Sequence, residues 1–201
     1  MRANKKPWGC EYLLYQNEDI AIWHLLIDGG HETSLHSHPN KKTGLVILDG
    51  AAKVSFLSSD QKLFAGEKTM IRHGVFHKTK NMTRNRLSLL EIETPVNKSD
   101  IVRLKDAYGR AGEPYSEEAQ CNITPITMTG FYGSCELKFV DVVNYDESDD
   151  FEIFLITKGK IGFSGFNVCA PGDVLSIENL NRFIDNFGES PLEGILVRSC
   201  L

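Results

Sequence analysis

Residues 30–50 read GHETSLHSHPNKKTGLVILDG, and residues 66–81 read GEKTMIRHGVFHKTKN. Glycines punctuate both stretches, with His36 and His38 in the first and His77 in the second. Successive side chains of a β-strand point to opposite faces, so His36 and His38 share one face if they lie on a strand. A ring from a neighbouring strand, supplied by His77, can meet them there. The two stretches therefore predict a sheet on which three imidazoles converge, an arrangement suited to a divalent metal.

This spacing resembles the two signature motifs of the cupin superfamily, small β-barrels that usually hold a divalent metal through three His and one Glu. The matching residues are Gly30, His36, His38 and Gly50 in the first motif, and Gly66, Gly74, His77 and Asn81 in the second. Two positions depart from the pattern. Thr43 stands where cupins usually carry the Glu, and Arg72 stands where a Pro usually precedes the second motif's glycine. The resemblance implies a jelly-roll barrel with His36, His38 and His77 as metal ligands.

Residues 6–9, 34–38, 49–54, 91–93 and 100–110 carry a closer resemblance, to the cupin of type II mannose-6-phosphate isomerases. That family has Gln in place of His36 and an Arg-x-Glu-His-Trp run in place of residues 41–45. The resemblance implies an aldose–ketose isomerisation of a phosphorylated or nucleotide-linked sugar in polysaccharide precursor metabolism. In such a reaction the metal polarises the carbonyl, and a carboxylate such as Glu91 or Glu93 moves the proton.

The distribution of strand and turn residues predicts two structured halves. Residues 11–93 read as short strands cut by turn residues, which is typical of a sandwich or barrel. Residues 96–120 lack this strand-and-turn pattern, and we expect them to form a connection that packs across the first barrel. Strand-like sequence returns in the last part of the chain. We therefore predict an all-β fold with two cupin double-stranded β-helix barrels in tandem, at residues 1–95 and 121–201.

The second half contains a partial echo of the first. Glu152 and Gly159 repeat the interval between Thr43 and Gly50. The positions that correspond to the histidines hold other side chains, namely Tyr145, Glu147 and Phe183. We therefore expect the second barrel to be degenerate and to carry no metal ligands.

Several polar residues near the histidines are candidates for substrate binding or catalysis. Glu91 and Glu93 share a strand face. In one interpretation, one of them points into the barrel as a carboxylate ligand or general base. In the other, both face solvent at the barrel rim. Lys41 and Arg72 would place cations at the barrel mouth, which suits an anionic sugar derivative, although lysines in such a loop are usually solvated. Thr43 either hydrogen-bonds a metal-bound water or marks a position without function.

The ligand set leaves the metal and the reaction open. Three neutral imidazoles leave a divalent ion its full charge and open coordination positions. Zn, Fe, Mn and Ni all accept such a site. Besides the isomerase-like bicupin that we favour, a three-His Fe(II) dioxygenase remains an alternative, because iron can then accept substrate and dioxygen together. A barrel that binds a sugar without catalysis is the third alternative.

The net charge, the apolar runs and the cysteine content limit the partners and the cellular location to expect for this protein. A net charge of −5 over 201 residues provides no basic field for nucleic acid or an anionic membrane. Apolar runs of signal-peptide or bilayer-spanning length are missing from the sequence, so the expected location is cytoplasmic. Five cysteines, an odd number without a Cys-x-x-Cys pair, indicate free thiols. By resemblance to cupins, which often pair through edge strands, we expect a homodimer.

Overall fold

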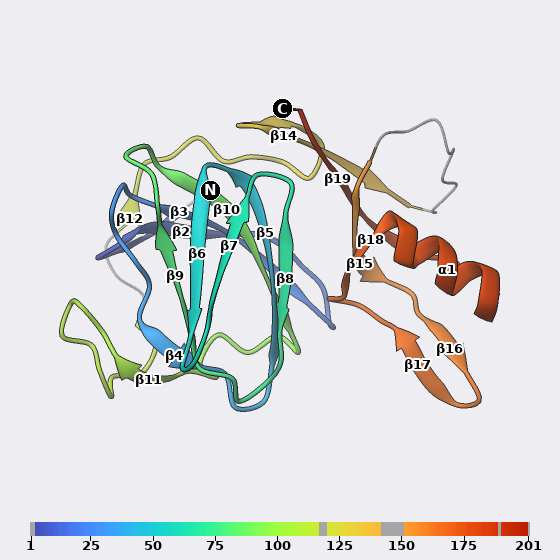
Figure 1. The fold of residues 1–201 in the computed structure, drawn as a ribbon, viewed down its shortest axis with the longest axis horizontal. Helices are drawn as coiled ribbons and strands as arrows, with labels where there is room; N and C mark the ends of the chain where they lie inside the picture. The colour runs from blue at the N-terminus through green and yellow to red at the C-terminus, as the bar shows by residue number, and fades with distance from the viewer. Residues whose placement is uncertain (1–2, 117–119, 142–150, 189, 201) are drawn as a thin grey trace.

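The computed structural model describes residues 3–116, 120–141, 151–188 and 190–200 (Figure 1). Two antiparallel sheets face each other and form the N-terminal barrel. The larger sheet contains, in spatial order, β12 (Gln120–Cys121), β1 (Ala3–Lys6), β2 (Gly9–Gln16), β3 (Ala21–Ile27), β10 (Leu87–Thr94), β5 (Lys42–Asp49) and β8 (Lys68–Ile71). The smaller sheet contains β11 (Val102–Lys105), β4 (Leu35–Ser37), β9 (His77–Asn81), β6 (Ala51–Phe56) and β7 (Asp60–Phe64).

Alternation along the strands fills the barrel interior. Leu45 and Ile47 of β5 and Leu87 and Leu89 of β10 pack inside it, against Val54 of β6. Gly50, with φ of 87°, turns the chain between β5 and β6, as the Asp-Gly pair predicts. The two sheets thus enclose an apolar core at one end of the barrel and leave the other end for polar side chains.

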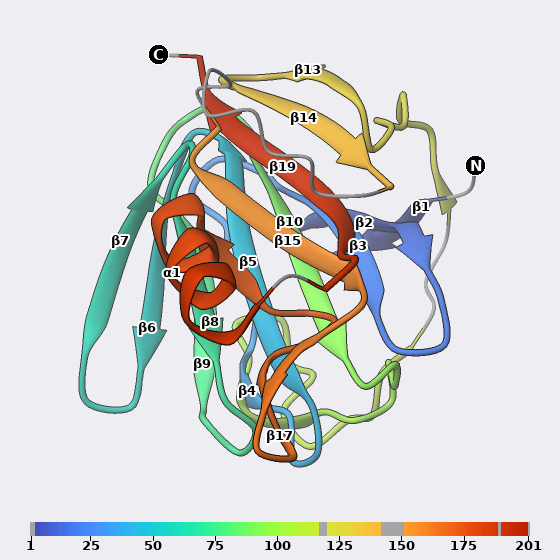
Figure 2. The same ribbon diagram turned by 90° about the vertical axis from the view of Figure 1, so that its right-hand side faces the viewer.

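The C-terminal half adds a third antiparallel sheet that packs on the outer face of the larger barrel sheet (Figure 2). Its strands are β13 (Gly130–Tyr132), β14 (Cys135–Val140), β19 (Glu193–Ser199), β15 (Ile153–Lys158) and β18 (Val174–Ser176). Leu155 and Val197 of this sheet contact a layer formed by Val46, Leu90 and Ile92, the residues of β5 and β10 that alternate with the barrel interior. The larger sheet is therefore buried on both faces.

A helix covers the far side of the third sheet, where the sequence pattern had indicated strands. α1 (Ile177–Phe187) begins at Ser176, whose side chain accepts a hydrogen bond from the Asn179 amide, and it buries Ile177 and Leu180. A hairpin of β16 (Ile161–Phe163) and β17 (Phe166–Cys169) projects beside it (Figure 1). The apolar residues of α1 recur at helical rather than strand spacing, but this signal is weak in so short a segment.

Two other expectations about the second half have different outcomes. Phe183, expected on a strand, lies on α1. Tyr145 and Glu147 lie outside the described residues. The all-β cupin fold is confirmed, while the division into barrels at residues 95 and 121 stays a prediction. Across the described ranges, no helix combines the length and the apolar character needed to cross a membrane.

We expect Leu155→Ala to lower the free energy of unfolding by about 2–5 kcal/mol, because it opens a cavity between two buried sheets. Phe166→Ala is the matched control: Phe166 is 77% exposed, and its truncation should change stability by no more than about 0.5 kcal/mol. Urea unfolding followed by circular dichroism measures both. Equal effects of the two substitutions would contradict this account of the packing.

Candidate metal centre

Three histidines converge at the polar end of the barrel. His36 of β4 and His77 of β9 are direct partners across the smaller sheet, and His38 lies just beyond β4. The ring centroids are 4.6 Å apart for His36 and His77, 4.8 Å for His36 and His38, and 5.4 Å for His38 and His77. All three residues are buried, and one nitrogen from each lies within 4.8 Å of the others.

Backbone carbonyls fix the orientation of each ring. Nδ1 of His36 lies 2.8 Å from the Ser34 carbonyl, and Nδ1 of His77 lies 3.0 Å from the Val75 carbonyl. Nδ1 of His38 lies 2.6 Å from the Asp100 carbonyl. A carbonyl only accepts, so each Nδ1 is the protonated nitrogen and Nε2 keeps its lone pair for a ligand.

The donor set fits a divalent metal. Nε2 of His38 is buried without a hydrogen-bond partner, and an imidazole nitrogen in that state needs a Lewis acid or a proton donor. Burial is the main cause that lowers the pKa of all three rings, to about 3 for His38. The rings are therefore neutral near pH 7, which is the form that binds metal.

A cluster of buried charges lies beside the histidines. Oε1 of Glu93 is 2.8 Å from Nζ of Lys41 and 3.1 Å from Nζ of Lys98. Lys98 also lies 3.7 Å from Glu91 and 3.6 Å from Glu11. Burial alone would lower the pKa of Lys98, but the three carboxylates outweigh burial and raise it. Lys98 therefore remains charged and binds the acidic side chains together.

Glu93 has one carboxylate oxygen that the lysines do not use. Oε2 of Glu93 is buried and has no hydrogen-bond partner, although both lysines hold Oε1. Glu91 and Glu93 both face the cavity that His36 and His38 line. Of the two orientations that the strand period allows, the structure therefore has the inward one.

The three residues expected to bind substrate have different positions. Lys41 is buried inside the barrel and paired with Glu93, rather than at the mouth, because its backbone turns inward where Asp100 holds the Lys41 amide. Arg72 is exposed, and the described residues that line the cavity do not include it. Thr43 is buried with its hydroxyl unpartnered, directly across from Glu93 on the neighbouring strand.

Several site residues were missed by sequence reasoning. Glu11 lies on β2 among apolar neighbours and faces the cavity, so a charge at an inward strand position was an available signal. Lys98 and Tyr115 also line the cavity, and the Tyr115 hydroxyl donates to Glu11 over 2.9 Å. Both come from the irregular connecting segment, which carries no periodicity to indicate their direction.

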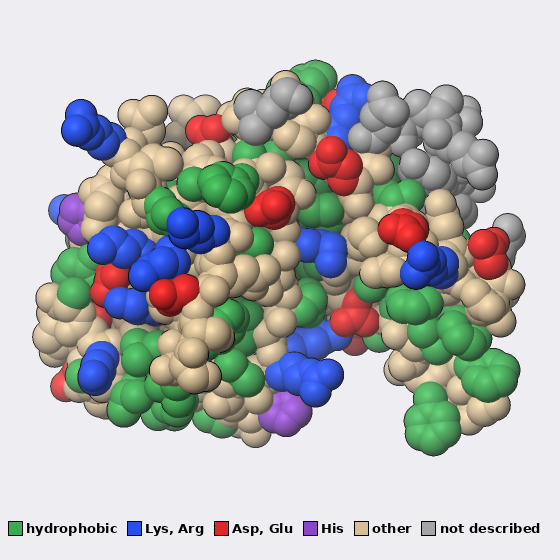
Figure 3. Space-filling model, in the orientation of Figure 1, with side chains coloured by type: hydrophobic (Ala, Val, Ile, Leu, Met, Phe, Trp, Pro, Cys, Tyr) green, Lys and Arg blue, Asp and Glu red, His purple; other side chains and the backbone are tan. Residues whose placement is uncertain are grey.

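The cavity is small and electropositive. It measures about 50 Å³ and is lined by five cationic and three anionic side chains, whereas the whole chain has a net charge of −5. Basic side chains gather around acidic ones on the barrel half of the face shown in Figure 3. The lining residues that carry charge are Lys6, Lys41, Lys98, Arg103, Arg110, Glu11, Glu91 and Glu93.

Two facing antiparallel sheets with three inward imidazoles define the cupin class of metal-site barrel. Within that class, residues 2–106 match the family model described as mannose-6-phosphate isomerase C-terminal. The chain belongs to this family.

Comparison with curated proteins gives relatives over the same half of the chain. XanB, the xanthan biosynthesis protein of Xanthomonas campestris, is 27% identical over 107 residues. A mannose-1-phosphate guanylyltransferase of Klebsiella pneumoniae is 29% identical over 107 residues. AlgA, the alginate biosynthesis protein of Pseudomonas aeruginosa, is 25% identical over 111 residues. The matches cover 52–54% of this chain and 23% of each relative, so the chain spans about a quarter of their length.

Solved structures with a similar fold include distant cupins. The oxalate decarboxylase of Lactobacillus farciminis aligns with a TM-score of 0.46 and 20% identity, over 51% of this chain and 33% of that one. KdgF from a Halomonas species aligns with a TM-score of 0.45 and 14% identity, over 48% of this chain and 89% of that one.

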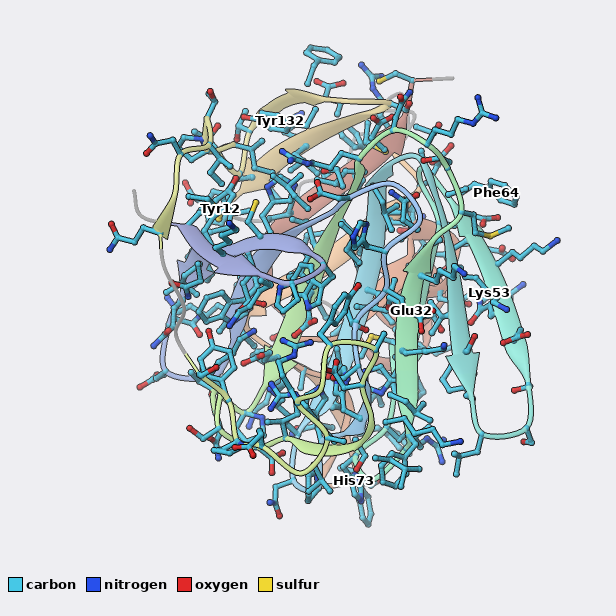
Figure 4. The ribbon with its side chains drawn as sticks, turned by 90° about the vertical axis from the view of Figure 1, so that its left-hand side faces the viewer. Tyr12, Glu32, Lys53, Phe64, His73 and Tyr132 are labelled. Carbon is cyan, nitrogen blue, oxygen red and sulfur yellow. The ribbon has the colours of Figure 1, made fainter. Side chains whose placement is uncertain are left out.

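We expect His38→Ala and His77→Ala each to abolish stoichiometric metal binding, because each removes one of three ligands. Elemental analysis of purified protein measures the metal, and circular dichroism confirms the fold. His73→Ala is the control: His73 is exposed at the lower edge of the molecule in Figure 4 and does not belong to the histidine cluster, so its loss should leave the metal content unchanged. Full metal content in both triad variants would exclude the site.

We expect the metal-free protein to lose stability as the pH falls from 6.5 towards 3. Over that range the unfolded chain protonates its histidines while the folded His38, with a pKa of about 3, does not. Each such histidine should lower the free energy of unfolding by about 1.4 kcal/mol per pH unit. Urea unfolding in a chelator gives the slope. The slope of the His38→Gln variant should be smaller by the contribution of one histidine, about 1.4 kcal/mol per pH unit. An unchanged slope would contradict the burial of this ring.

Proposed function

We propose that this protein is a metal-dependent isomerase of a phosphorylated sugar. The observation that carries the proposal is Glu93: its Oε1 is fixed by two lysines, and its buried Oε2 is unpartnered beside three inward imidazoles. A carboxylate with one fixed and one unused oxygen is suited to accept and return a proton. Its family and the sugar-polymer biosynthesis named in its relatives support this substrate class.

The isomerisation that we assign to Glu93 moves protons within the sugar and involves no net oxidation or reduction. Oε2 of Glu93 takes the proton from C2 of an aldose and returns it to C1, while the hydroxyl proton at C2 passes to the oxygen at C1. The aldehyde becomes a hydroxymethyl group, and the carbonyl moves to C2. His36, His38 and His77 would hold a divalent metal, which would polarise the carbonyl oxygen.

Lys41 and Lys98 hold Oε1 of Glu93 in place. Each lies within 3.1 Å of Oε1, and Lys41 is 1% exposed, so water does not screen the pair. One carboxylate oxygen is thus fixed, and the buried Oε2 is left without a hydrogen-bond partner for the proposed proton transfer. Their mutual pairing offsets part of the cost of burying these charges.

The charge of the cavity supports an anionic substrate. Cations outnumber anions among the lining side chains, and a bound divalent metal increases the excess. A volume of about 50 Å³ holds an ion and its waters, whereas small-molecule sites typically measure ~300–1,000 Å³.

An Fe(II) oxygenase is the second candidate function. Among the described residues, the candidate ligand atoms that lie within 4.8 Å of one another all belong to imidazoles. Three such ligands would leave open coordination positions on iron. The lysine-bound Glu93 favours the isomerase instead, because moving a proton between C2 and C1 needs a positioned base. Oxygen uptake by the anaerobically iron-loaded protein on thiol and diketone substrates would favour the oxygenase.

We expect Glu93→Gln to lower kcat for the conversion of mannose 6-phosphate to fructose 6-phosphate by about 10²–10⁴-fold, with metal content retained. The control is Glu91→Gln, which should have a smaller effect because Glu93 has the free buried oxygen. Exchange of the C2 proton with solvent deuterium, followed by NMR, measures the step directly. A metal-loaded wild type that catalyses neither exchange nor conversion of this sugar phosphate would count against the proposal.

A further inference from the structure

His38 is held differently from the other two imidazoles. The carbonyls that hold His36 and His77 come from Ser34 and Val75, each two residues earlier on the same segment. The carbonyl that holds His38 belongs to Asp100, 62 residues away in the connecting segment, and its distance of 2.6 Å is the shortest of the three. The orientation of one ligand therefore depends on a long-range contact.

The side chain of Asp100 fixes the same region a second time. Its carboxylate accepts hydrogen bonds from the Asn40 amide at 2.9 Å, the Asn40 side chain at 2.9 Å and the Lys41 amide at 3.0 Å. Asp100 is buried, so these bonds are shielded from water. One residue thus holds the ring of His38 through its backbone and the two residues after Pro39 through its carboxylate.

We propose that Asp100 is a positioning residue of the metal centre, and that its side chain docks the connecting segment so that His38 presents Nε2 to the metal. The inference rests on metal binding in the proposed function and extends it to a residue outside the ligand set. Partners that orient a ligating histidine typically change metal affinity by 10–100-fold.

The docking also reaches the carboxylate that the proposed reaction uses. Lys98, two residues before Asp100, contacts Glu93 at 3.1 Å, so the same short segment orients a metal ligand and holds the base. Metal binding and docking of this segment therefore favour one another by the same free energy, since coupling between two equilibria is reciprocal.

The first test is the zinc affinity of the full chain, measured by competition with a chromogenic chelator. We expect Asp100→Ala to raise the Kd about 10–100-fold. Asp28→Ala is the matched control, because the Asp28 carboxylate pairs with Arg86 at 2.8 Å and neither residue lines the cavity. Its Kd should match that of the wild type. If Asp100→Ala does not fold, Asp100→Asn keeps the side-chain volume and should raise the Kd in the same direction.

The second test reads the ring of His38 without any metal. Long-range ¹H–¹⁵N NMR should show all three triad rings protonated at Nδ1 in the wild type, and only His38 losing this single tautomer in Asp100→Ala. An unchanged His38 tautomer with an unchanged Kd would overturn the proposal, and so would a simultaneous change in all three rings. A wild type that binds none of Zn, Fe, Mn and Ni would refute the proposed function, while the tautomers would still decide whether Asp100 positions His38.

Discussion

The hydrogen bond from a histidine Nδ1 to a backbone carbonyl is the constraint on which the site depends. An imidazole has two nitrogens, and in each of His36, His38 and His77 one of them is committed to a carbonyl. The other nitrogen must then face the barrel interior, where water is scarce and a proton is costly. Nε2 of His38, buried and without a hydrogen-bond partner among the described residues, is therefore suited to bind a cation together with the other two rings.

Charge balance extends this constraint to the rest of the cavity. Lys41, Lys98 and Glu93 are buried together, and removing one partner would leave the others uncompensated, at a cost of about 3–5 kcal/mol for such a pair. The cluster is therefore held as a unit. Both lysines contact Oε1 of Glu93, so the role that we propose for Lys41 is to hold this carboxylate, while its binding to substrate stays a prediction.

The sequence was informative where strand periodicity determines direction. The period of two placed His36 with His38 and Glu91 with Glu93 on common faces, and the structure has both pairs facing inward. Prediction was weak outside regular strands. Lys98 and Asp100 lie in an irregular segment whose path is set by packing between distant residues, and the inward turn of Lys41 depends on that path. The helix α1 was missed because tertiary packing against the third sheet, rather than a long repeat, gives it a buried face.

The third sheet explains how a half of the chain that lies outside the cavity still affects the site. The described residues lining the cavity all precede residue 116, yet β10 and β5 carry site residues on one face and contact the third sheet with the other. Gly172 lies so close to the Thr94 side chain, at the end of β10, that a Cβ at Gly172 would overlap the Thr94 hydroxyl. Lys42 at the start of β5 pairs with Asp173 at 2.5 Å. Because packed layers transmit displacement with little compression, the outer sheet fixes the strand ends from which Glu93 projects.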